Sequence, residues 1–467
     1  MPAMFGQKAV PAALSLWLLA LLALVRGALY LTVMPPWQGP DEPAHFEAHR
    51  LLEEYRRPTS LADRSPLLDR ELIHSLYTYR TWSYLNRQPP TPLPERFENT
   101  PQFGVGRTTG RFSLAYVFYA IAVSPWIDQP IVVQLYAMRA ISVLMGMVVV
   151  LLTFEVARQA FPARPLVAWG AALFVLFLPQ HGLTAASLYD GNLAELLTTS
   201  ALYLTLKAMR QGFTAWRVTL LLLCCGAAFI TKATAYAILP VPLIVLTTAL
   251  RRGISDRRVR PWQLALAASI CATGLLAAVL LSQQLLAYLK GWAVTLFDQE
   301  WRQRVMLVIW GGRLEKALAG FALACKTLFM SFWMDFSWLS LTLPSEFYLS
   351  LLVLTVLGIA GWCTLVRGTA PAEKPVVTIV SLTAALPVLF LLGLFVSSTT
   401  GNILRQGRFL FVAISPMAII ATGGWLALFP PRFERVALML FTAGLVALDA
   451  FSLFNTAIPF FYLTPFN

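Results

Sequence analysis

Residues 10–34 read VPAALSLWLLALLALVRGALYLTVM, and residues 35–49 continue as PPWQGPDEPAHFEAH. The first stretch is long and apolar enough to cross a hydrocarbon layer about 30 Å thick as one helix, and the prolines and Gly39 that follow end it. It is too long for a signal-peptide core and carries Arg26 instead of a small-residue cleavage site, so it should remain as the first membrane helix. Because a charge that faces lipid is costly, we expect Arg26 to face the bundle interior, paired with an acid.

Apolar runs of similar length recur along most of the chain. Of its 467 residues, 58% are hydrophobic and 13% are charged, and the mean hydropathy is +0.66. A soluble globular chain averages roughly 45–50% apolar and about 25% charged residues. These values exclude an ordinary soluble enzyme, a secreted domain and a disordered scaffold. A transmembrane barrel would show short alternating segments instead, so the predicted fold class is an all-α polytopic membrane protein.

The net charge of +13 is better explained by membrane topology than by nucleic-acid binding, because cytoplasmic loops concentrate Lys and Arg. With a cytoplasmic N-terminus, every strongly basic connection between apolar runs falls on one side. This alternation predicts about eleven transmembrane helices, with the C-terminus outside, in a single membrane domain over 1–467. Besides 10–34, the predicted spans are 131–157, 165–182, 193–209, 216–231, 234–250, 261–285, 347–366, 375–397, 408–429 and 435–455.

Two polar segments are predicted on the outer face. The first, 35–130, contains an amphipathic helix and a short apolar piece, 112–127, which is more typical of an interfacial helix than of a span. The second is 286–346. Helices 2–7 occupy 131–285 between them, and the C-terminal helices occupy 347–467. The five cysteines lie in apolar runs without metal-ligand spacing and are expected to behave as small core hydrophobes.

Carboxylates gather next to two predicted helix starts in the outer segments. Asp41 and Glu42 follow the helix terminator, and Pro43 suits the first turn of a new helix. This helix is either a capped amphipathic surface helix, 41–56, with solvated charges, or a device that holds Asp41 and Glu42 at the mouth of a cavity. Asp190 also precedes a predicted helix, where a carboxylate can simply cap.

Two histidines lie one helical turn beyond these acids. His45 and His49 are four residues apart, so they share a helical face, and that spacing can bind a divalent metal. Histidine pairs at this spacing are also common on helix surfaces without any ligand. The sequence therefore leaves the metal open, with none assigned.

Cations also occur at the predicted outer boundary. Lys232 stands alone between two apolar runs, either as a lysine that snorkels to the surface or as an anchor for an anionic lipid head group. Arg405 and Arg408 lie where the positive-inside rule does not account for them, and arginine forks bind phosphate well. The aromatic run FWMDFSW at 332–338 is typical of an interfacial belt.

Carboxylates and cations at one bilayer boundary suit a reaction between a membrane-borne phosphate ester and a nucleophile that arrives from outside. The carboxylate would take the proton of the nucleophile. The cations would hold the phosphate leaving group and offset the charge that develops on it.

The motif PDEPAHF at 40–46, directly after a first membrane helix, resembles the first-loop motif of GT-C membrane glycosyltransferases. This superfamily includes lipid A aminoarabinose transferases, protein O-mannosyltransferases and a broad bacterial group of uncharacterised homologues. Further motifs in the same order look like signatures of that bacterial group. They are Arg139 in MRAIS, Thr231-Lys232, Phe332-Trp333 with Trp338, and QGRFL at 406–410.

The resemblance implies a GT-C-like bundle that uses a polyprenyl-phosphate sugar, such as an undecaprenyl-phosphate sugar, outside the bacterial cytoplasmic (inner) membrane, usually with inversion. It assigns the general base to Asp41. The second acid of such enzymes usually follows Asn, whereas the order here is Tyr189-Asp190-Gly191-Asn192, so the acid is displaced. The segment Gly110–Tyr116 also departs from the usual Pro-Pro-Leu-Tyr-Tyr helix start, which leaves the contact made there open.

The prediction is therefore a multi-pass glycosyltransferase with its active site facing the periplasm or exterior. Its acceptor is a glycan, a lipid or a protein, and no nucleic acid is expected. A transporter or flippase of a lipid-linked saccharide is the alternative, although it would need charges in both halves of the bilayer. An inactive scaffold with the same fold is a third reading. The proposed residues are Asp41, Glu42 and Asp190 for catalysis, Lys232, Arg405 and Arg408 for the donor phosphate, and His45 and His49 for acceptor or metal contacts.

Overall fold

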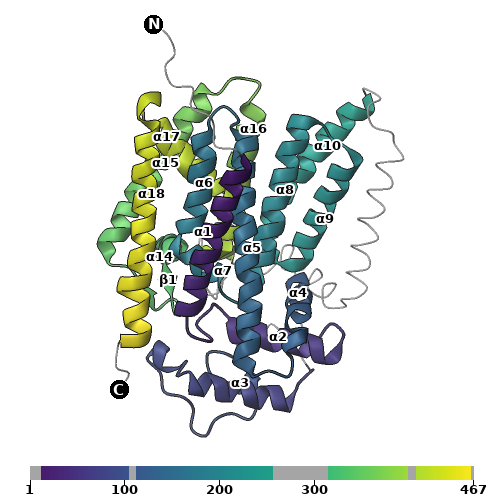
Figure 1. The fold of residues 1–467 in the computed structure, drawn as a ribbon, viewed down its shortest axis with the longest axis vertical. Helices are drawn as coiled ribbons and strands as arrows, with labels where there is room; N and C mark the ends of the chain where they lie inside the picture. Colours follow the sequence, from purple (N-terminus) through teal and green to yellow (C-terminus); the bar gives the residue numbers. More distant parts are fainter. Residues whose placement is uncertain (1–11, 61, 105–111, 256–313, 398–405, 464–467) are drawn as a thin grey trace.

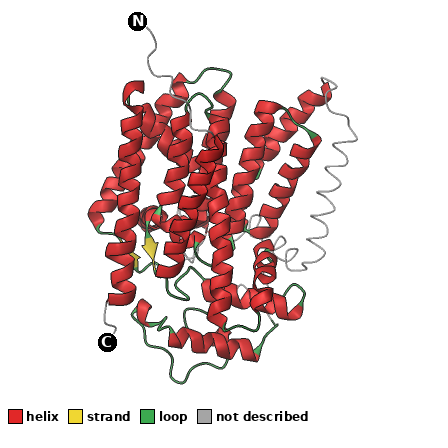
Figure 2. Ribbon diagram, in the orientation of Figure 1, coloured by secondary structure: helices red, strands yellow, loops and turns green. Residues whose placement is uncertain are grey.

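The computed structural model describes residues 12–60, 62–104, 112–255, 314–397 and 406–463. Long helices stand side by side, and two helices of the first loop lie across one end of the bundle, which we call the α2–α3 end (Figure 1). Apart from two strands of two residues each, the regular structure described is helical (Figure 2). The predicted all-α fold class is confirmed.

Except for the helix over 314–333, the bundle helices coincide with the predicted apolar runs, and shorter elements connect them. The bundle comprises α1 (Ala12–Val33), α5 (Ile131–Ala160), α6 (Pro165–Phe177), α7 (Pro179–Ala185), α8 (Gly191–Gln211), α9 (Ala215–Thr231), α10 (Pro240–Ser255), α14 (Leu314–Trp333), α15 (Ser345–Gly368), α16 (Lys374–Ser397), α17 (Ile414–Ala427) and α18 (Glu434–Ala450). The other elements used below are α2 (Glu42–Tyr55), α3 (Pro66–Thr78), α4 (Leu114–Val123), η4 (Ala233–Ala237), β1 (Asp335–Phe336), β2 (Leu341–Thr342), η5 (Gly407–Ala413) and the π-helical turns Phe451–Ala457 and Pro459–Leu463.

Six helical segments among the described residues are long and apolar enough to cross a membrane. The count becomes seven if α6 and α7, which meet at an angle of 66°, form one bent span. Helices also occupy every other predicted span except 261–285, which lies outside the described residues. The polytopic architecture is confirmed, whereas the count of eleven stays a prediction.

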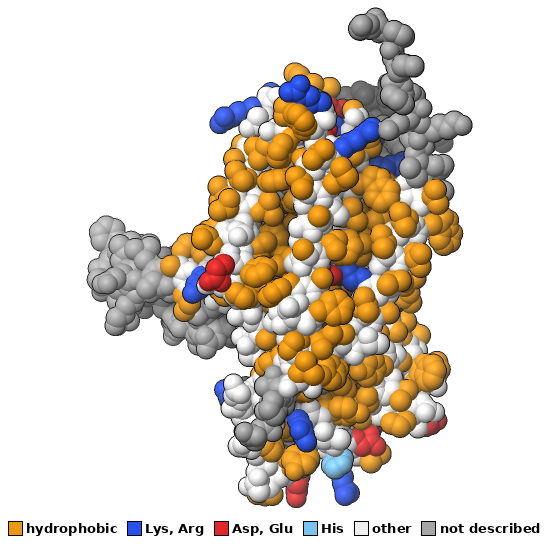
Figure 3. All heavy atoms as spheres, turned by 60° about the vertical axis from the view of Figure 1, so that its left-hand side comes forward, with side chains coloured by type: hydrophobic (Ala, Val, Ile, Leu, Met, Phe, Trp, Pro, Cys, Tyr) orange, Lys and Arg blue, Asp and Glu red, His pale blue; other side chains and the backbone are white. Residues whose placement is uncertain are grey.

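The flank of the bundle has the composition expected of a surface in contact with lipid. Large apolar side chains are exposed there, such as Trp17 at 75% and Leu21 at 60% on α1. Figure 3 shows hydrophobic side chains over most of this flank, with charged side chains gathered mainly toward its ends. A soluble protein rarely exposes so continuous an apolar surface, so the chain is a multi-pass membrane protein.

Basic connections gather at the end of the bundle opposite α2 and α3. The links between α5 and α6, α8 and α9, α15 and α16, and α17 and α18 lie at that end (Figure 1). They carry or adjoin Arg164, Arg210, Arg367 and Arg432. The positive-inside rule therefore predicts that this end is cytoplasmic and that the α2–α3 end faces outward.

Arg26 meets the acid that its position in α1 requires. Its guanidinium donates to both carboxylate oxygens of Asp449 in α18, at 2.6 and 2.8 Å, and to the carbonyl of Leu178 at 2.9 Å. The hydroxyl of Tyr30 donates to the same carboxylate at 2.7 Å. The pair is buried, so the expectation that Arg26 faces the bundle interior is confirmed, and the pair ties α1 to α18.

Two helices, α4 and α14, refine the predicted outer segments. Helix α4 has ten residues, or about 15 Å of helix at 1.5 Å per residue, which is too short to span. This agrees with the interfacial helix predicted for 112–127. Within the predicted outer segment 286–346, α14 forms a helix of 20 residues. Its residues Leu328 and Phe332 pack with Leu391 of α16, so this part belongs to the helix packing and not to a loop.

The orientation is testable by cysteine accessibility. In a background without native cysteines, Glu95→Cys in the first loop is expected to react with a membrane-impermeant maleimide in intact cells. Ala370→Cys, between α15 and α16, is expected to react only after the membrane is permeabilised. Both positions are exposed in the structure, so accessibility reports the side of the membrane. The reverse pattern would overturn the outward placement of the α2–α3 end.

Candidate active site

Asp41 lies in the turn between α1 and α2 and meets a cation from the far end of the chain. Its backbone is left-handed, with a φ of 55°, whereas a capping residue needs an extended backbone. Its carboxylate accordingly makes no capping hydrogen bond. Instead, Oδ2 accepts a hydrogen bond of 2.5 Å from Nη2 of Arg408 in η5. Asp41 thus precedes a helix as predicted, but its side chain faces the site, and the capping alternative is wrong.

Glu42 is directed away from this pair and holds the turn in place. Its side chain is fully buried, and Arg139 of α5 donates to both of its carboxylate oxygens at 2.7 and 2.8 Å. The backbone amides of Gly39 and Leu188 donate to the same carboxylate, and Arg139 also donates to two carbonyls just after α1. With its oxygens bonded inside the protein, Glu42 supports the turn that presents Asp41.

Lys232 and Asp190 form a second pair beside the first. Lys232 ends α9, and its ammonium bonds the carboxylate of Asp190, the residue before α8. Asp190 makes no capping hydrogen bond with α8. The Lys232 side chain is 12% exposed, so the alternative of a snorkelling lysine is wrong.

One aromatic ring joins the two pairs. Nζ of Lys232 lies 3.9 Å from the ring centroid of Tyr189, and the Arg408 guanidinium carbon lies 4.9 Å from the same centroid. Tyr189 is buried, and an aromatic face attracts cations electrostatically. Nε and Nη1 of Arg408 are buried without a hydrogen-bond partner among the described residues. The ring therefore gathers two cations and leaves donors on one of them for a ligand.

The electrostatics keep both carboxylates charged. Burial raises the pKa of each carboxyl group, but the neighbouring cations more than offset it. Arg408, with Lys232, holds the pKa of Asp41 below its ordinary value. Lys232, with Arg408, lowers the pKa of Asp190 in the same way. Both carboxylates are therefore ionised at neutral pH and are able to accept a proton.

His45 and His49 lie on one face of α2, against Tyr116 of α4. Nδ1 of His45 is 3.2 Å from the Tyr116 hydroxyl, and its Nε2 is 3.9 Å from Oδ1 of Asp190. Nδ1 of His49 is 3.2 Å from the Tyr116 carbonyl oxygen. Burial lowers the pKa of both rings, that of His49 to about 3. Both histidines are buried, so the alternative of a solvated surface helix over 41–56 is wrong.

The histidines do not form part of a recognisable metal centre. Within the described ranges, no group of three or more His, Cys, Asp or Glu side chains is arranged to hold an ion. The nearest arrangement is His45 beside Asp190, whose carboxylate already bonds Lys232.

The structure brings five of the sequence-predicted residues together, from four separate segments of the chain: Asp41, His45, Asp190, Lys232 and Arg408. Glu42 and His49 adjoin them without sharing their hydrogen bonds. Arg405 lies outside the described residues. The sequence reasoning passed over Tyr189 as a site residue, although its place directly before an acid in a predicted outer connection was a usable signal.

The aromatic run 332–338 is not an interfacial belt. Trp333 and Phe336 are 4% and 0% exposed, and Trp338 donates from Nε1 to the Trp37 carbonyl at 3.2 Å. The segment contains β1 and packs the first loop against α7 and η5, so the belt prediction is wrong. Because its side chains are buried, the run is better interpreted as part of the wall of the site.

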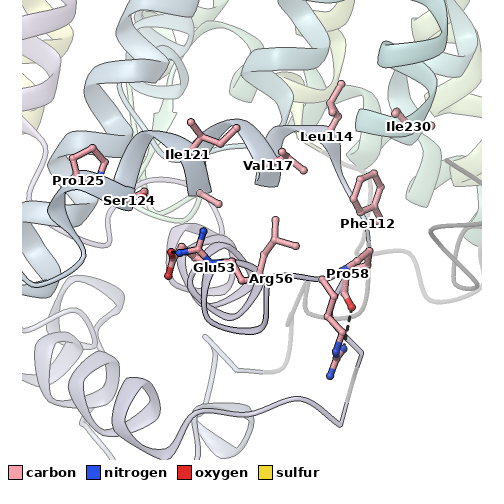
Figure 4. Close-up of a pocket in the computed structure, with 13 residues that line it drawn as sticks. Glu53, Arg56, Pro58, Phe112, Leu114, Val117, Ile121, Ser124, Pro125 and Ile230 are labelled. Carbon is pink, nitrogen blue, oxygen red and sulfur yellow. Dashed lines mark hydrogen bonds and ion pairs between the residues drawn. The ribbon is translucent and has the colours of Figure 1, made fainter. Parts of the chain in front are cut away.

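A cavity of about 680 Å³ lies at the α2–α3 end of the bundle. Figure 4 shows its two unlike sides: apolar residues of α4, with Ile230 of α9, face the charged end of α2. The two cations that directly follow α2 at its rim, Arg56 and Arg57, are paired with Glu53 and Asp63. Ser113 donates to the Thr231 carbonyl at 2.9 Å, which places the start of α4 beside the residue before Lys232.

No protein-family model matches the chain, and no curated protein matches it in sequence. In its fold it is similar to the crystal structure of ArnT from Cupriavidus metallidurans bound to undecaprenyl phosphate, with 14% identity over 97% of this chain and 74% of that one and a TM-score of 0.47. It is also similar to the oligosaccharyltransferase of Archaeoglobus fulgidus tethered to an acceptor peptide, with 13% identity and a TM-score of 0.48. That match covers 95% of this chain and 55% of the other.

Both of these proteins belong to the GT-C superfamily, which the sequence motifs also resemble.

Proposed function

We propose that this chain is a membrane glycosyltransferase that moves a sugar from a polyprenyl-phosphate donor to an acceptor outside the bacterial cytoplasmic membrane. One observation carries the proposal: the Asp41–Arg408 and Lys232–Asp190 pairs meet on the Tyr189 ring at the α2–α3 end. A base and two phosphate-binding cations then lie together where a lipid-linked donor has its reacting group.

Arg408 and Lys232 are the proposed donor-phosphate ligands. Two nitrogens of the buried Arg408 have no hydrogen-bond partner among the described residues, and buried donors are rarely left unpaired in native proteins. An ammonium has three donors, so Lys232 can bond a phosphate while it keeps Asp190. The four charges of the two pairs cancel in the free protein, and the donor would bring its own negative charge to the two cations.

Asp41 is the proposed base. Its Oδ2 bonds Arg408, and the side chain remains 43% exposed, so the carboxylate is accessible to an acceptor. The acceptor oxygen forms a bond to the anomeric carbon as the bond from that carbon to the phosphate oxygen breaks. The electron pair leaves with the polyprenyl phosphate, whose added charge Arg408 and Lys232 offset, and the acceptor proton moves to Asp41. A single displacement of this kind inverts the anomeric configuration.

Asp190 and His45 are proposed to tune and position this machinery. Asp190 orients Lys232, and neutral His45 lies between Tyr116 and Asp190. Glu42 is proposed to act indirectly, as a positioning residue that holds the turn carrying Asp41. The 680 Å³ cavity beside α4 is proposed to take part of a lipid-linked substrate, because its wall is apolar and it adjoins the end of α9.

A transporter or flippase of a lipid-linked saccharide is favoured less. Alternating access needs polar groups that face a pathway in both halves of the bilayer. Among the described residues, the two pairs proposed for catalysis lie at one end, whereas the buried pair Arg26–Asp449 between α1 and α18 is saturated by protein partners. An inactive scaffold would have little reason to retain two unpaired donors on a buried arginine.

The test is sugar transfer in proteoliposomes from a panel of polyprenyl phosphates, each linked to one radiolabelled hexose. The expected result is label on a water-soluble or lipid acceptor together with free polyprenyl phosphate, and much slower transfer by the Asp41→Asn protein. Movement of the intact donor across the bilayer without bond cleavage would favour the flippase. If no donor supports either transfer or movement, the inactive scaffold is the interpretation that remains.

A further inference from the structure

A second, small cavity is lined in part by Asp41 and lies between the first loop, α7, β1 and η5. Its volume is about 40 Å³, close to the space that one water molecule or one hydroxyl group occupies. Its lining includes Asp41 and Arg408 of the proposed machinery, together with Gln38, Gln180, Asp335 and Trp338. None of the last four was singled out as a ligand by sequence reasoning.

Unpaired polar atoms gather on the residues that line this cavity. Oδ1 of Asp335 and Nε2 of Gln38 are buried without a hydrogen-bond partner among the described residues, as are Nε and Nη1 of Arg408. Most buried polar atoms in native proteins are paired, and each exception calls for an explanation. With the two Arg408 nitrogens assigned to the donor phosphate, the unpaired atoms of Asp335 and Gln38 still point to a further bound group that is absent from the free protein.

Asp335 is held rigidly in this position. It is 7% exposed, and its backbone amide donates to Oε1 of Gln180 at 2.7 Å. The chain then passes through β1 into a turn in which three successive residues, 337–339, have positive φ. On the other side, Gly407 packs so closely that a β-carbon there would lie 2.1 Å from the backbone nitrogen of Phe332. The cavity wall is therefore preformed.

Asp335 also differs from the other acids of the site, because no cation pairs with it among the described residues. Burial raises the pKa of its carboxyl to about 7. The ionisable groups around it are Asp41 and Arg408, which line the same cavity, and Tyr348, whose hydroxyl bonds the carbonyl of Met334 and the amide of Leu343. A carboxyl kept in this state costs stability, which suggests a functional reason for its presence.

We propose that this cavity binds a hydroxyl group of the acceptor, with Asp335 and Gln38 as its ligands, so that the acceptor of the proposed transferase is a saccharide or another polyol. The inference rests on the proposed function. An unpaired donor on Gln38 and an unpaired acceptor on Asp335 complement a hydroxyl, which donates one hydrogen bond and accepts others. A phosphate oxygen only accepts and would lie against two carboxyl groups. An ammonium would lie beside the Arg408 guanidinium.

The first experiment measures binding without transfer. Protein in detergent-free lipid nanodiscs is heated with and without methyl glucoside, which serves as the polyol probe. The wild type is expected to gain several degrees in Tm at saturating probe, whereas Asp335→Ala and Gln38→Leu should gain much less. Asp63→Asn is the matched control, because Asp63 is a carboxylate of the first loop that pairs with Arg57 outside the cavity. Equal gains in all four proteins would overturn the proposal.

The second experiment measures transfer to octyl glucoside, octylamine and octyl phosphate as alternative acceptors. Only octyl glucoside is expected to accept the sugar. Asp335→Ala should raise its KM roughly 5–20-fold, about the effect of one lost hydrogen bond, with kcat changed less. Asp335→Asn, which can still donate and accept, should recover most of the loss. Preference for the amine or the phosphate, or an unchanged KM in Asp335→Ala, would overturn the proposal.

Stability separates this role from a structural one. Because the folded pKa of Asp335 is raised, the wild type should lose stability as pH rises from about 4 to 7, the interval between the unfolded and folded pKa values. Asp335→Asn should remove this loss and raise Tm at pH 8, whereas a residue needed for folding would lower it. If no donor supports transfer but methyl glucoside still stabilises the wild type and not Asp335→Ala, the proposed function fails and the hydroxyl site stands.

Discussion

Asp41→Asn is expected to reduce sugar transfer roughly 10²–10⁴-fold, the usual contribution of a general acid or base. Asn keeps the size of the side chain and tolerates the left-handed backbone at this position, but it has no basic carboxylate. The variant also leaves the buried Arg408 without its carboxylate partner, so Arg408 should bind a donor phosphate at least as well as before. Transfer assays combined with donor-binding measurements on the same preparation check both expectations.

The combination of slow transfer with retained donor binding distinguishes a base from a structural residue. Asp63→Asn again serves as the control, because it removes a first-loop carboxylate at a distance from the cluster. Full transfer by Asp41→Asn would show that Asp41 is not the base. Loss of transfer accompanied by loss of donor binding would show that the pair is needed only for the fold, and the base would then be sought at Asp190.

Arg408→Ala is expected to weaken donor use by about 2–5 kcal/mol, the range for removing one partner of a buried charge pair. Its side chain is 3% exposed, so no water replaces the lost guanidinium easily. Arg408→Lys should recover only part of the loss, since a compact ammonium replaces a planar fork with several fixed donors. The measurement is kcat/KM for the donor at fixed acceptor, together with the donor Kd.

The same variant should also change the pH dependence of transfer. Arg408 is the largest influence that lowers the pKa of Asp41, and without it burial dominates and the pKa rises. The acid limb of the pH profile should therefore move to higher pH. Arg96→Ala is the control, because the Arg96 side chain is 59% exposed and pairs with Glu98 of the first loop, and it lines neither cavity. Unchanged donor dependence in a folded Arg408→Ala protein would place the phosphate site elsewhere.

The architecture could be predicted because its signals are local. An apolar run of membrane length forms a helix wherever it lies, since its backbone must satisfy its hydrogen bonds internally in lipid. The same reasoning predicted the interior position of Arg26 and its need for an acid, because a lone charge in the bilayer is too costly. It also predicted that Asp41 and Asp190 stand directly before helices and that Lys232 ends one.

The tertiary structure decided which charges meet. Arg408 is 367 residues from Asp41, Arg139 is 97 residues from Glu42, and Lys232 is 42 residues from Asp190. These choices depend on how helices from distant parts of the chain pack, and neither spacing nor periodicity records that packing. For the same reason the sequence left two interpretations of α2 open, a surface helix or a device that holds the acids at a cavity mouth. Burial of its histidines and of Asp335 came only from the neighbours that cover them, because burial belongs to the assembled fold and not to a segment.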